Sequence, residues 1–366
     1  MMTTRSLRLA LLCTSLVAGC GVGPAPYQPD EHGGQAGGVG GPLCPDPTMD
    51  CTNSQGNGKG VYYDEDGYAG FTEPTQVLIT HFINGTKTVA FDGVYYNPVD
   101  SKWLPLPPNA GHVVGADFAG QGGYAVYNIS ESGTDLTVTL FDPVTNTPRA
   151  ISQNDLRLLT LRLRLTNPND SKQFTNYLVR FTDSVSDKGV TAYHLEWQVA
   201  GLTSWVSYCT DHKGYADRAV FQHGVYVNPW TGKVTRNATT ESSYVTMSCR
   251  LGAPATCATW GYDALQNTEL FAGCIQMKRA SYCGDENAYT ISGTFIGISD
   301  YQGIKADGFD DGSIEANWTG NGATCIKHQR HPELGFSGAC NGVPIPVCDV
   351  NHLPADHLVS SLSAKQ

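Results

Sequence analysis

Cysteine spacing is the feature that most constrains how this chain can fold. The 366 residues contain twelve cysteines, of which Cys13 and Cys20 lie near the N-terminus. The other ten are an even number, which predicts up to five disulfide bonds in an exported protein. Their connectivity stays open, although Cys44 with Cys51 and Cys340 with Cys348 form the shortest loops. The candidates are Cys44, Cys51, Cys209, Cys249, Cys257, Cys274, Cys283, Cys325, Cys340 and Cys348.

Zinc binding is the competing interpretation of these cysteines. Structural zinc modules usually contain C-x-x-C pairs, and this sequence has none. The spacings of 8, 17 and 9 from Cys249 to Cys257, Cys274 and Cys283 match no zinc module. We therefore predict disulfides, no metal site and no cofactor.

The N-terminus has the organisation of an export signal. Arg5 and Arg8 precede an apolar run from Leu9 to Ala18, and small residues then lead to Cys20. This run is much shorter than the roughly twenty residues of a membrane-spanning helix. Small residues before the cysteine resemble the lipobox of bacterial lipoproteins, which implies that Cys20 is acylated. We predict a lipoprotein signal peptide at 1–19 and a lipid anchor at Cys20; a simple secretory signal is the alternative.

Residues 20–72 form a predicted flexible tether. Between Gly21 and Gly60, seventeen of forty residues are Gly or Pro, with few aliphatic side chains to bury. Such a segment cannot recover its ordering entropy by burial. Its place after the anchor predicts a domain held away from a membrane.

Charge and hydropathy limit the possible partners and locations. Removal of Arg5 and Arg8 with the signal changes the formal net charge from -11 to -13. An acidic protein lacks the basic patch that phosphate binding needs, so we expect no nucleic acid partner. The only membrane contact we expect is the lipid anchor. We predict the cell envelope, at the outer membrane or cell surface, with a periplasmic or secreted protein as the alternative.

Strand patterns dominate the rest of the chain. Residues 76–91 resemble a hairpin around Asn84-Gly85, a dipeptide typical of type I′ turns. Strict alternation at 161–165 places leucines toward a core and arginines toward water. Further strands are expected at 135–141, 156–165, 177–182, 191–198, 219–227, 243–249 and 289–298.

One segment has a helical pattern. Leu270, Cys274 and Met277 recur at helical spacing between 262 and 279, with Asp263 as the expected N-cap. The fold class is therefore mainly β, an antiparallel sandwich or barrel-like sheet with one short helical insertion, stapled by disulfides. We expect a β-rich domain at 73–325, as one domain or two, and a C-terminal extension with a loose tail at 326–366.

Residues 249–300 carry a recognisable motif. Trp260-Gly261-Tyr262 follows Cys257, and Arg279 leads into Ala280-Ser281-Tyr282-Cys283-Gly284-Asp285. This arrangement resembles the ADYC domain, a bacterial domain named for the tetrapeptide at 280–283. Weaker similarity extends back to about residue 115. The resemblance implies an exported protein or lipoprotein and brings no established activity. Because Ser281 replaces the Asp of the family name, a catalytic or metal-binding role for that carboxylate does not transfer.

Several residues could carry chemistry. Cys283 beside Asp285 could be a thiol nucleophile, but no histidine lies near it in sequence, so disulfide bonding is favoured. His328 with His331, and His352 with His357, have metal-ligand spacing in loop-like segments, where solvated histidines are the favoured interpretation.

Other clusters have structural interpretations that are favoured over functional ones. Arg157, Arg162 and Arg164 could bind anions or could simply face solvent. Acidic glycine loops at 64–67 and 307–312 could bind calcium, but turns are favoured. Aromatic residues could stack on a ligand or pack across strands; they are Tyr62, Tyr63, Tyr95, Tyr96 and Trp103.

These observations leave two functional hypotheses. The first is a lipid-anchored cell-envelope protein that acts as a non-catalytic binding or structural module with a protein or glycan ligand. The second is an extracytoplasmic hydrolase or metal-dependent enzyme. The sequence has no G-x-S-x-G, H-E-x-x-H or nucleotide-binding motif, which favours the first hypothesis.

Overall fold

The computed structural model describes most of the chain beyond residue 76. The described residues are 51–52, 69–71, 77–85, 88–97, 102–132, 134–142, 144–145, 147–168, 170–187, 189–210, 216–236, 244–291 and 294–362. The predicted signal peptide, Cys20, Cys44, Tyr62, Tyr63 and the acidic loop at 64–67 lie outside them.

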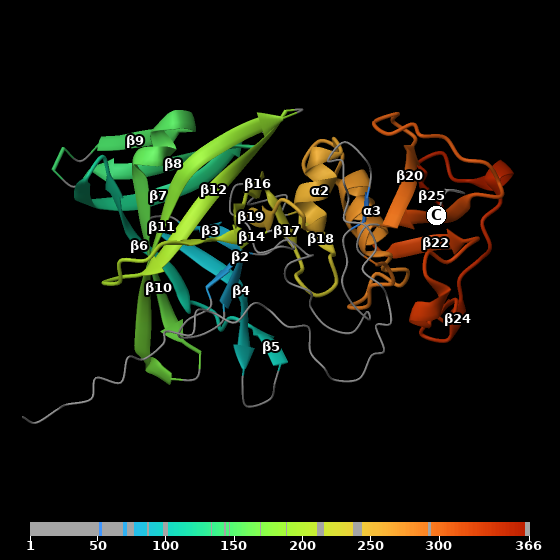
Figure 1. The fold of residues 1–366 in the computed structure, drawn as a ribbon, viewed down its shortest axis with the longest axis horizontal. Coiled ribbons are helices and arrows are strands. Elements are labelled where there is room, and N and C mark those ends of the chain that lie inside the picture. The colour runs from blue at the N-terminus through green and yellow to red at the C-terminus, as the bar shows by residue number, and fades with distance from the viewer. Residues whose placement is uncertain are drawn as a thin grey trace, which may run out of the picture. The chain divides into compact units, whose positions relative to one another are not determined.

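Eight antiparallel strands form a closed barrel (Figure 1). In order around the ring, the strands are β4 (Val89–Asn97), β3 (Val77–Asn84), β19 (Tyr244–Cys249), β16 (Ala219–His223), β12 (Val190–Val199), β11 (Asp170–Asp187), β10 (Leu159–Asn167) and β6 (Gly111–Phe118). Neighbouring strands are hydrogen-bonded, and β6 pairs with β4, so the ring has no free edge. This confirms the predicted mainly β, antiparallel, barrel-like class.

Hydrophobic alternation explains which side of the barrel wall is buried. Leu161, Leu163 and Leu165 of β10 are almost fully buried in the core, while Arg162 and Arg164 between them are exposed. The same core contains large side chains from the strands on all sides of the ring. The barrel interior is therefore a packed hydrophobic core.

A three-stranded meander extends the barrel sheet. It consists of β7 (Gln121–Ser132), β8 (Asp135–Asp142) and β9 (Thr147–Ser152), followed by the 3-10 helix η1 (Gln153–Leu158). β7 also lies against β3, β4, β16 and β19, and the Asn84 amide exchanges two hydrogen bonds with the Ile129 backbone at 2.7 and 2.9 Å. The meander thereby contributes its apolar face to the barrel core.

A second core lies C-terminal to the barrel strands. The helices α2 (Ala253–Thr259) and α3 (Thr268–Arg279) are followed by a five-stranded sheet. In spatial order its strands are β1 (Cys51–Thr52), β20 (Thr294–Asp300), β25 (Leu358–Leu362), β21 (Ile314–Thr319) and β22 (Gly322–Ile326). α3 packs on this sheet at close range, because a Cβ at Gly273 would lie 3.3 Å from the Trp318 carbonyl oxygen.

Short elements complete the fold. Strands of two to four residues and short 3-10 helices connect the two sheets or lie at their edges. They are β2 (Ala69–Phe71), β5 (Lys102–Pro105), β13 (Val206–Ser207), β14 (Cys209–Thr210), β15 (Ala216–Asp217), β17 (Val225–Val227), β18 (Val234–Arg236), η3 (Pro332–Leu334), β23 (Ala339–Cys340), β24 (Val343–Pro344) and η4 (Val350–His352).

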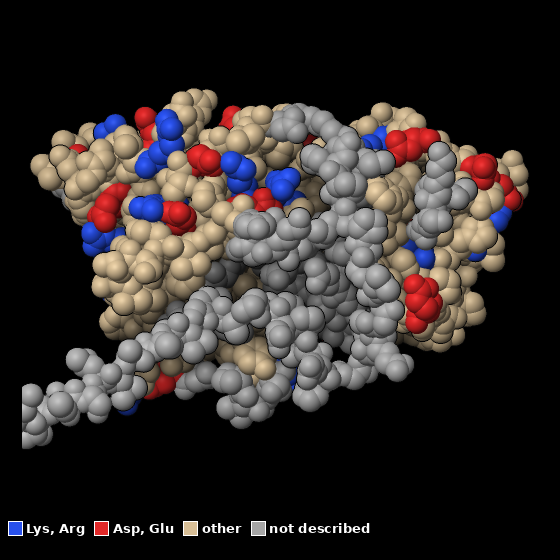
Figure 2. All heavy atoms as spheres, viewed as in Figure 1, with Lys and Arg blue, Asp and Glu red and all other residues tan. Residues whose placement is uncertain are grey.

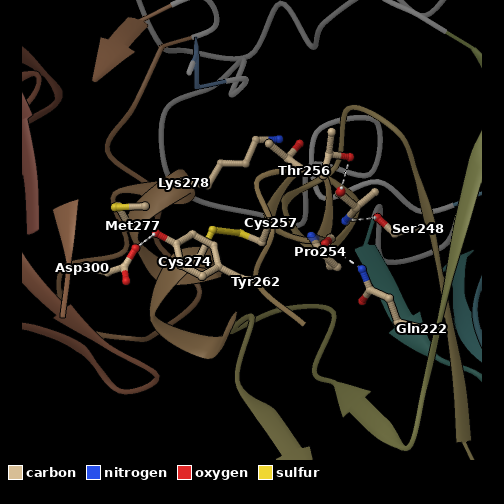
Figure 3. The surroundings of a disulfide bond; sticks show 12 residues. Gln222, Ser248, Pro254, Thr256, Cys257, Tyr262, Cys274, Met277, Lys278 and Asp300 are labelled. Carbon is tan, nitrogen blue, oxygen red and sulfur yellow. Dashed lines mark hydrogen bonds between the residues drawn. A yellow bond between two sulfur atoms is a disulfide. The ribbon is translucent and has the colours of Figure 1, made fainter. Parts of the chain in front are cut away.

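Four disulfides join elements that are separated in sequence. The described pairs are Cys209–Cys249, Cys257–Cys274, Cys283–Cys340 and Cys325–Cys348. Cys257–Cys274 fastens α2 to α3 inside the second core (Figure 3). The predicted Cys340–Cys348 pairing is wrong, because the fold places Cys340 beside Cys283 and Cys348 beside Cys325. The predicted Cys44–Cys51 pairing falls outside the described residues.

Three local predictions differ from the structure. The Asn84-Gly85 dipeptide forms no two-residue turn, since Asn84 pairs with Val89 and leaves a four-residue loop. The helical insertion contains two helices; α2 is rich in small residues that are nearly all buried, so it shows no amphipathic pattern. Asp263 accepts the backbone N–H groups of Leu265 and Gln266 and therefore forms a turn ahead of α3.

The C-terminal region contains a strand, β25, at Leu358–Leu362. The expected loose tail contains β25, which lies between β20 and β21 in the second sheet. The five residues of β25, LVSSL, show no pattern that predicts a central strand with a neighbour on each side. The second sheet therefore crosses the boundary that was expected at residue 325.

Within the described residues, no helix has both the length and the apolar character needed to cross a membrane.

Candidate functional site

The tetrapeptide at 280–283 ends α3. Ala280 adopts the left-handed conformation with φ 49°, and its N–H donates to the Met277 carbonyl. Ser281 N–H donates to the Gln276 carbonyl at 2.9 Å, which completes a Schellman motif. The first two motif positions thus satisfy carbonyl groups that a helix end leaves unpaired.

Tyr282 is the centre of an aromatic cluster. Its ring stacks on Phe336 at 4.7 Å, Trp318 at 5.3 Å and Tyr289 at 5.8 Å between centroids. Only 1% of the residue is exposed. Ring packing of this kind stabilises a core through both burial and favourable stacking.

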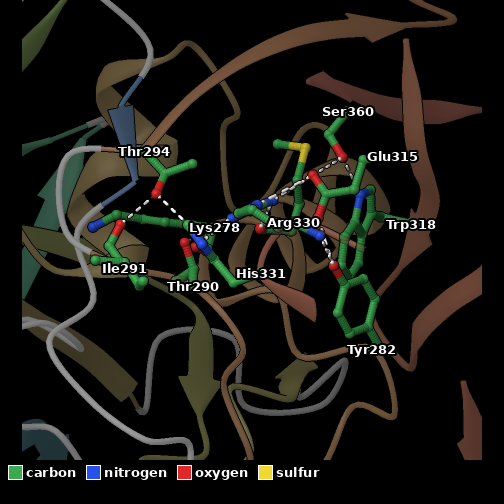
Figure 4. A network of polar contacts seen from close by, with 11 residues as sticks. Lys278, Tyr282, Thr290, Ile291, Thr294, Glu315, Trp318, Arg330, His331 and Ser360 are labelled. Atoms are coloured by element: carbon green, nitrogen blue, oxygen red, sulfur yellow. Dashed lines mark hydrogen bonds and ion pairs between the residues drawn. The ribbon is translucent and has the colours of Figure 1, made fainter. Parts of the chain in front are cut away.

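The Tyr282 hydroxyl lies in a buried ionic network (Figure 4). It donates to Glu315 Oε1 at 3.0 Å and accepts the Arg330 backbone N–H at 2.8 Å. Burial, and next the negative charge of Glu315, raise the pKa of this hydroxyl well above its usual value. Tyr282 therefore stays protonated, and its hydroxyl donates a hydrogen bond to the Glu315 carboxylate.

Arg330 and Glu315 form an ion pair with no exposed side-chain surface. Arg330 Nη2 lies 2.8 Å from Glu315 Oε2 and also donates to the Met277 carbonyl. Arg330 Nη1 donates to the Lys278 carbonyl and to the Thr290 hydroxyl. Ser360 donates to the same carboxylate oxygen at 2.8 Å. Met277 and Lys278 belong to α3, Glu315 to β21 and Ser360 to β25. The network therefore joins the end of α3 to these two strands.

Ser281 has a local role. Its hydroxyl donates to the Asp285 carbonyl at 3.1 Å, and Asp285 in turn accepts from the Asn287 backbone. Gly284 follows with φ 59°, and a Cβ there would lie 2.3 Å from the Asn321 carbonyl oxygen. This close approach explains why glycine follows the bonded Cys283. A serine in place of the family aspartate fits this turn.

A second polar site joins the barrel to the strand β17. A bulge in β3 turns both Thr80 and His81 out of the barrel core, and His81 stacks on Tyr226 at 4.2 Å. The Val227 N–H donates to His81 Nε2 at 3.1 Å, which leaves Nδ1–H to donate to Thr80 Oγ1 at 2.7 Å. Burial lowers the pKa of His81 to about 3. The neutral ring is therefore a fixed connector.

The outer face of β10, β11 and β12 carries arginines with fixed partners. Arg162 binds Asp117 in bidentate fashion at 2.7 and 3.1 Å. Arg180 pairs with Glu196 at 2.6 Å and lies 4.1 Å over the Trp205 ring.

Arg164 completes this face. It donates to Asn176 at 3.1 Å and lies 4.5 Å over Phe174, whose side chain is largely exposed. We call Arg162, Arg164, Phe174, Arg180 and Trp205 the arginine–aromatic face. The alternative of an anion-binding stripe of Arg157, Arg162 and Arg164 does not fit this arrangement, since Arg157 lies on η1 and donates to the Asn154 carbonyl.

The predicted chemical residues are separated in space. Cys283 is in a disulfide, so its expected oxidation is confirmed. His331 contacts Thr294 and Glu333, whereas His352 contacts Asp349. Among the described residues, no group of three or more His, Cys, Asp or Glu side chains could hold a metal ion.

The remaining clusters have structural contacts. Asp307 accepts the Ile298 N–H, and Asp311 pairs with Lys327. Tyr96 and Trp103 pack across β4 and β5 with centroids 5.5 Å apart, while Tyr95 is buried.

Sequence reasoning missed His81, Glu315 and Arg330. Each is a polar residue inside a strand or loop with no motif around it, and its burial depends on partners far away in the chain. The alternation of β21 gives no such signal, because Glu315 stands between the apolar Ile314 and Ala316 and a bulge breaks the register between those two positions.

Residues 153–332 match the family model of the ADYC domain. The motif residues Trp260, Gly261, Tyr262, Arg279 and Ala280–Asp285 lie inside this match, so the chain carries an ADYC domain over that range. No curated protein and no solved structure matches the chain.

Arg330→Met should lower the free energy of unfolding by about 3–5 kcal/mol, because it leaves Glu315 buried without a counterion. The double variant Arg330→Met/Glu315→Leu should lose less. Denaturant unfolding of the disulfide-intact protein measures both. Arg162→Met, at an exposed pair, is the control and should change stability by at most about 1 kcal/mol. A single variant as stable as the double one would contradict the buried pair's role.

His81 should make stability depend on pH. The unfolded histidine takes up a proton near pH 6.5, whereas the folded one does so only near 3. Between these values the unfolded state binds more protons, so stability should fall by up to about 1.4 kcal/mol for each unit that the pH is lowered. Denaturant unfolding from pH 7 to 4 measures this slope, and His81→Gln should reduce it. The exposed His352→Gln variant should keep it.

Proposed function

We propose that this ADYC-domain protein is anchored in the bacterial cell envelope by a lipid on Cys20 and acts there as a binding or structural module. The disulfides indicate an extracytoplasmic location. The export signal and Cys20 support the lipid anchor and a place at the outer membrane or cell surface. The Gly-rich segment at 20–72 would hold the domain away from the membrane.

The contrast between the domain's interior and its surface supports a binding role. Tyr282, Glu315 and Arg330 have their polar groups committed to partners within the fold. The arginine–aromatic face, in contrast, lies at the surface. Its arginine side chains are held in place by hydrogen bonds to neighbouring residues of the fold. A surface with restricted side chains loses little conformational entropy on binding.

The charge distribution favours binding of a specific ligand over non-specific attraction of oppositely charged molecules. Basic and acidic side chains lie next to one another on the visible face of the molecule (Figure 2). Arg162 and Arg180 are each compensated by a carboxylate, so the face offers directed hydrogen bonds and aromatic contacts with little net charge. Such a surface suits a glycan or a protein ligand.

The lipid anchor predicts incorporation of a palmitate analogue in the native host. Cys20→Ala should abolish labelling and release the protein from membranes, because it removes the cysteine at the lipobox position. Cys13→Ala is the matched control and should be labelled like the natural protein. A thiol count on the denatured protein should find none of the eight described disulfide cysteines free. Unlabelled protein with reduced thiols would refute the proposed location.

The binding role predicts that the purified protein co-sediments with envelope glycan or crosslinks to one envelope protein. Arg164→Ala with Phe174→Ala should weaken that binding by about tenfold or more, since stacked arginine and aromatic residues commonly dominate interfaces. Arg149→Ala, which removes an arginine stacked on Phe118 at the edge of the meander, is the control. Equal binding by the double variant and the control would exclude the arginine–aromatic face.

A further inference from the structure

Three side chains near the start of β20 form a hydroxyl–imidazole–carboxylate relay. Thr294 Oγ1 lies 2.7 Å from His331 Nε2. His331 Nδ1 lies 2.8 Å from Glu333 Oε1. These are the distances that join a nucleophile to a general base and the base to the group that orients it. We call Thr294, His331 and Glu333 the threonine relay.

Hydrogen-bond accounting fixes the direction of the relay. Partial burial would raise the pKa of Glu333, but hydrogen bonds from its own backbone and from His331 outweigh burial and lower it. The ionised carboxylate can only accept, so His331 Nδ1 carries a proton. In the neutral ring, Nε2 is then the acceptor that faces the Thr294 hydroxyl.

The Thr294 hydroxyl can turn toward this acceptor. It also lies 2.7 Å from the Ile291 carbonyl oxygen. That carbonyl already accepts the Thr294 backbone N–H at 3.1 Å. The carbonyl therefore keeps a partner when the hydroxyl donates to His331, and the reactive arrangement leaves no buried group unpaired.

The fold holds the relay in place from both sides. Thr294 is in β20, and His331 directly follows Arg330, whose guanidinium is fixed by Glu315 and the end of α3 (Figure 4). Pro332 restricts the backbone between His331 and Glu333. Because the supporting groups are buried, the relay is pre-organised.

Exposure decreases along the relay from the carboxylate to the hydroxyl. The Glu333 side chain is 60% exposed and that of His331 13%, while Thr294 as a residue is 7% exposed. The histidine can exchange protons with solvent, and the hydroxyl offers little surface. This gradient restricts a reacting group at Thr294 to a small one.

We propose that the threonine relay hydrolyses carboxylic esters of small acyl groups, an activity that goes beyond the binding or structural role. The Thr294 oxygen forms a bond to the acyl carbon as its proton passes to His331 Nε2. The ester C–O bond breaks, and the alcohol leaves with that proton. Water, deprotonated by His331, then attacks the acyl-threonine, which releases the carboxylic acid and returns the proton to Thr294. Glu333 is a positioning residue.

Hydrolysis of p-nitrophenyl acetate by the full-length protein tests this proposal. Turnover should be accompanied by an acetyl adduct on Thr294, located by mass spectrometry. Thr294→Val and His331→Gln should lower kcat by about 100-fold or more, the usual contribution of a general base. Glu333→Gln should lower kcat while KM changes little. Thr294→Ser should keep activity, because it retains the hydroxyl.

His352→Gln is the matched control, since His352 is also paired with a carboxylate but has no hydroxyl partner among its described contacts. It should retain full activity, which excludes general catalysis by surface imidazole. Native disulfides and circular dichroism establish that each variant is folded. If Thr294→Val does not fold, kcat of Thr294→Ser is compared with kcat of Glu333→Gln. The proposal requires that the first variant keeps activity and that the second loses it. Absence of an acyl-Thr294 adduct in the natural protein, or equal rates in natural and His331→Gln protein, would overturn the proposal.

Discussion

The second core depends on the buried pairing of Arg330 with Glu315. A guanidinium without solvent must have its donors satisfied by the protein, and these donors reach a carboxylate, a hydroxyl and two carbonyls at the end of α3. The same carboxylate accepts from Tyr282 and Ser360. One charge pair thus fixes a helix end, the family motif and the last strand relative to one another, and each of these depends on the others being in place.

The ADYC tetrapeptide has a physical explanation in this setting. Ala280 and Ser281 close α3 through a Schellman motif, Tyr282 fills the aromatic cluster and supplies the hydroxyl for Glu315, and Cys283 fastens the following turn to β23. Each position satisfies a structural requirement that appears once a helix must end against a sheet. The motif therefore marks a structural junction between α3 and the second sheet.

Local patterns were reliable where burial follows sequence directly. The alternation of leucine and arginine in β10, the helical spacing in α3 and the oxidation of Cys283 were all predictable. Sequence patterns failed to predict structure where the neighbours of a residue come from a distant part of the chain. The placement of β25 between β20 and β21 depends on strands elsewhere in the chain, and the partners of Cys340 and Cys348 depend on how the hairpin of β23 and β24 lies on the core.

Sequence alone determined a mainly β, antiparallel chain with paired cysteines, because alternation, composition and residue counts can be read without the tertiary structure. Closure of the barrel between β4 and β6, the burial of His81 against β17 and the joining of Thr294 to His331 were decided only by the tertiary structure. Each of these brings together residues separated by twenty positions or more, and their energies arise from desolvation that exists only after the surrounding segments have packed.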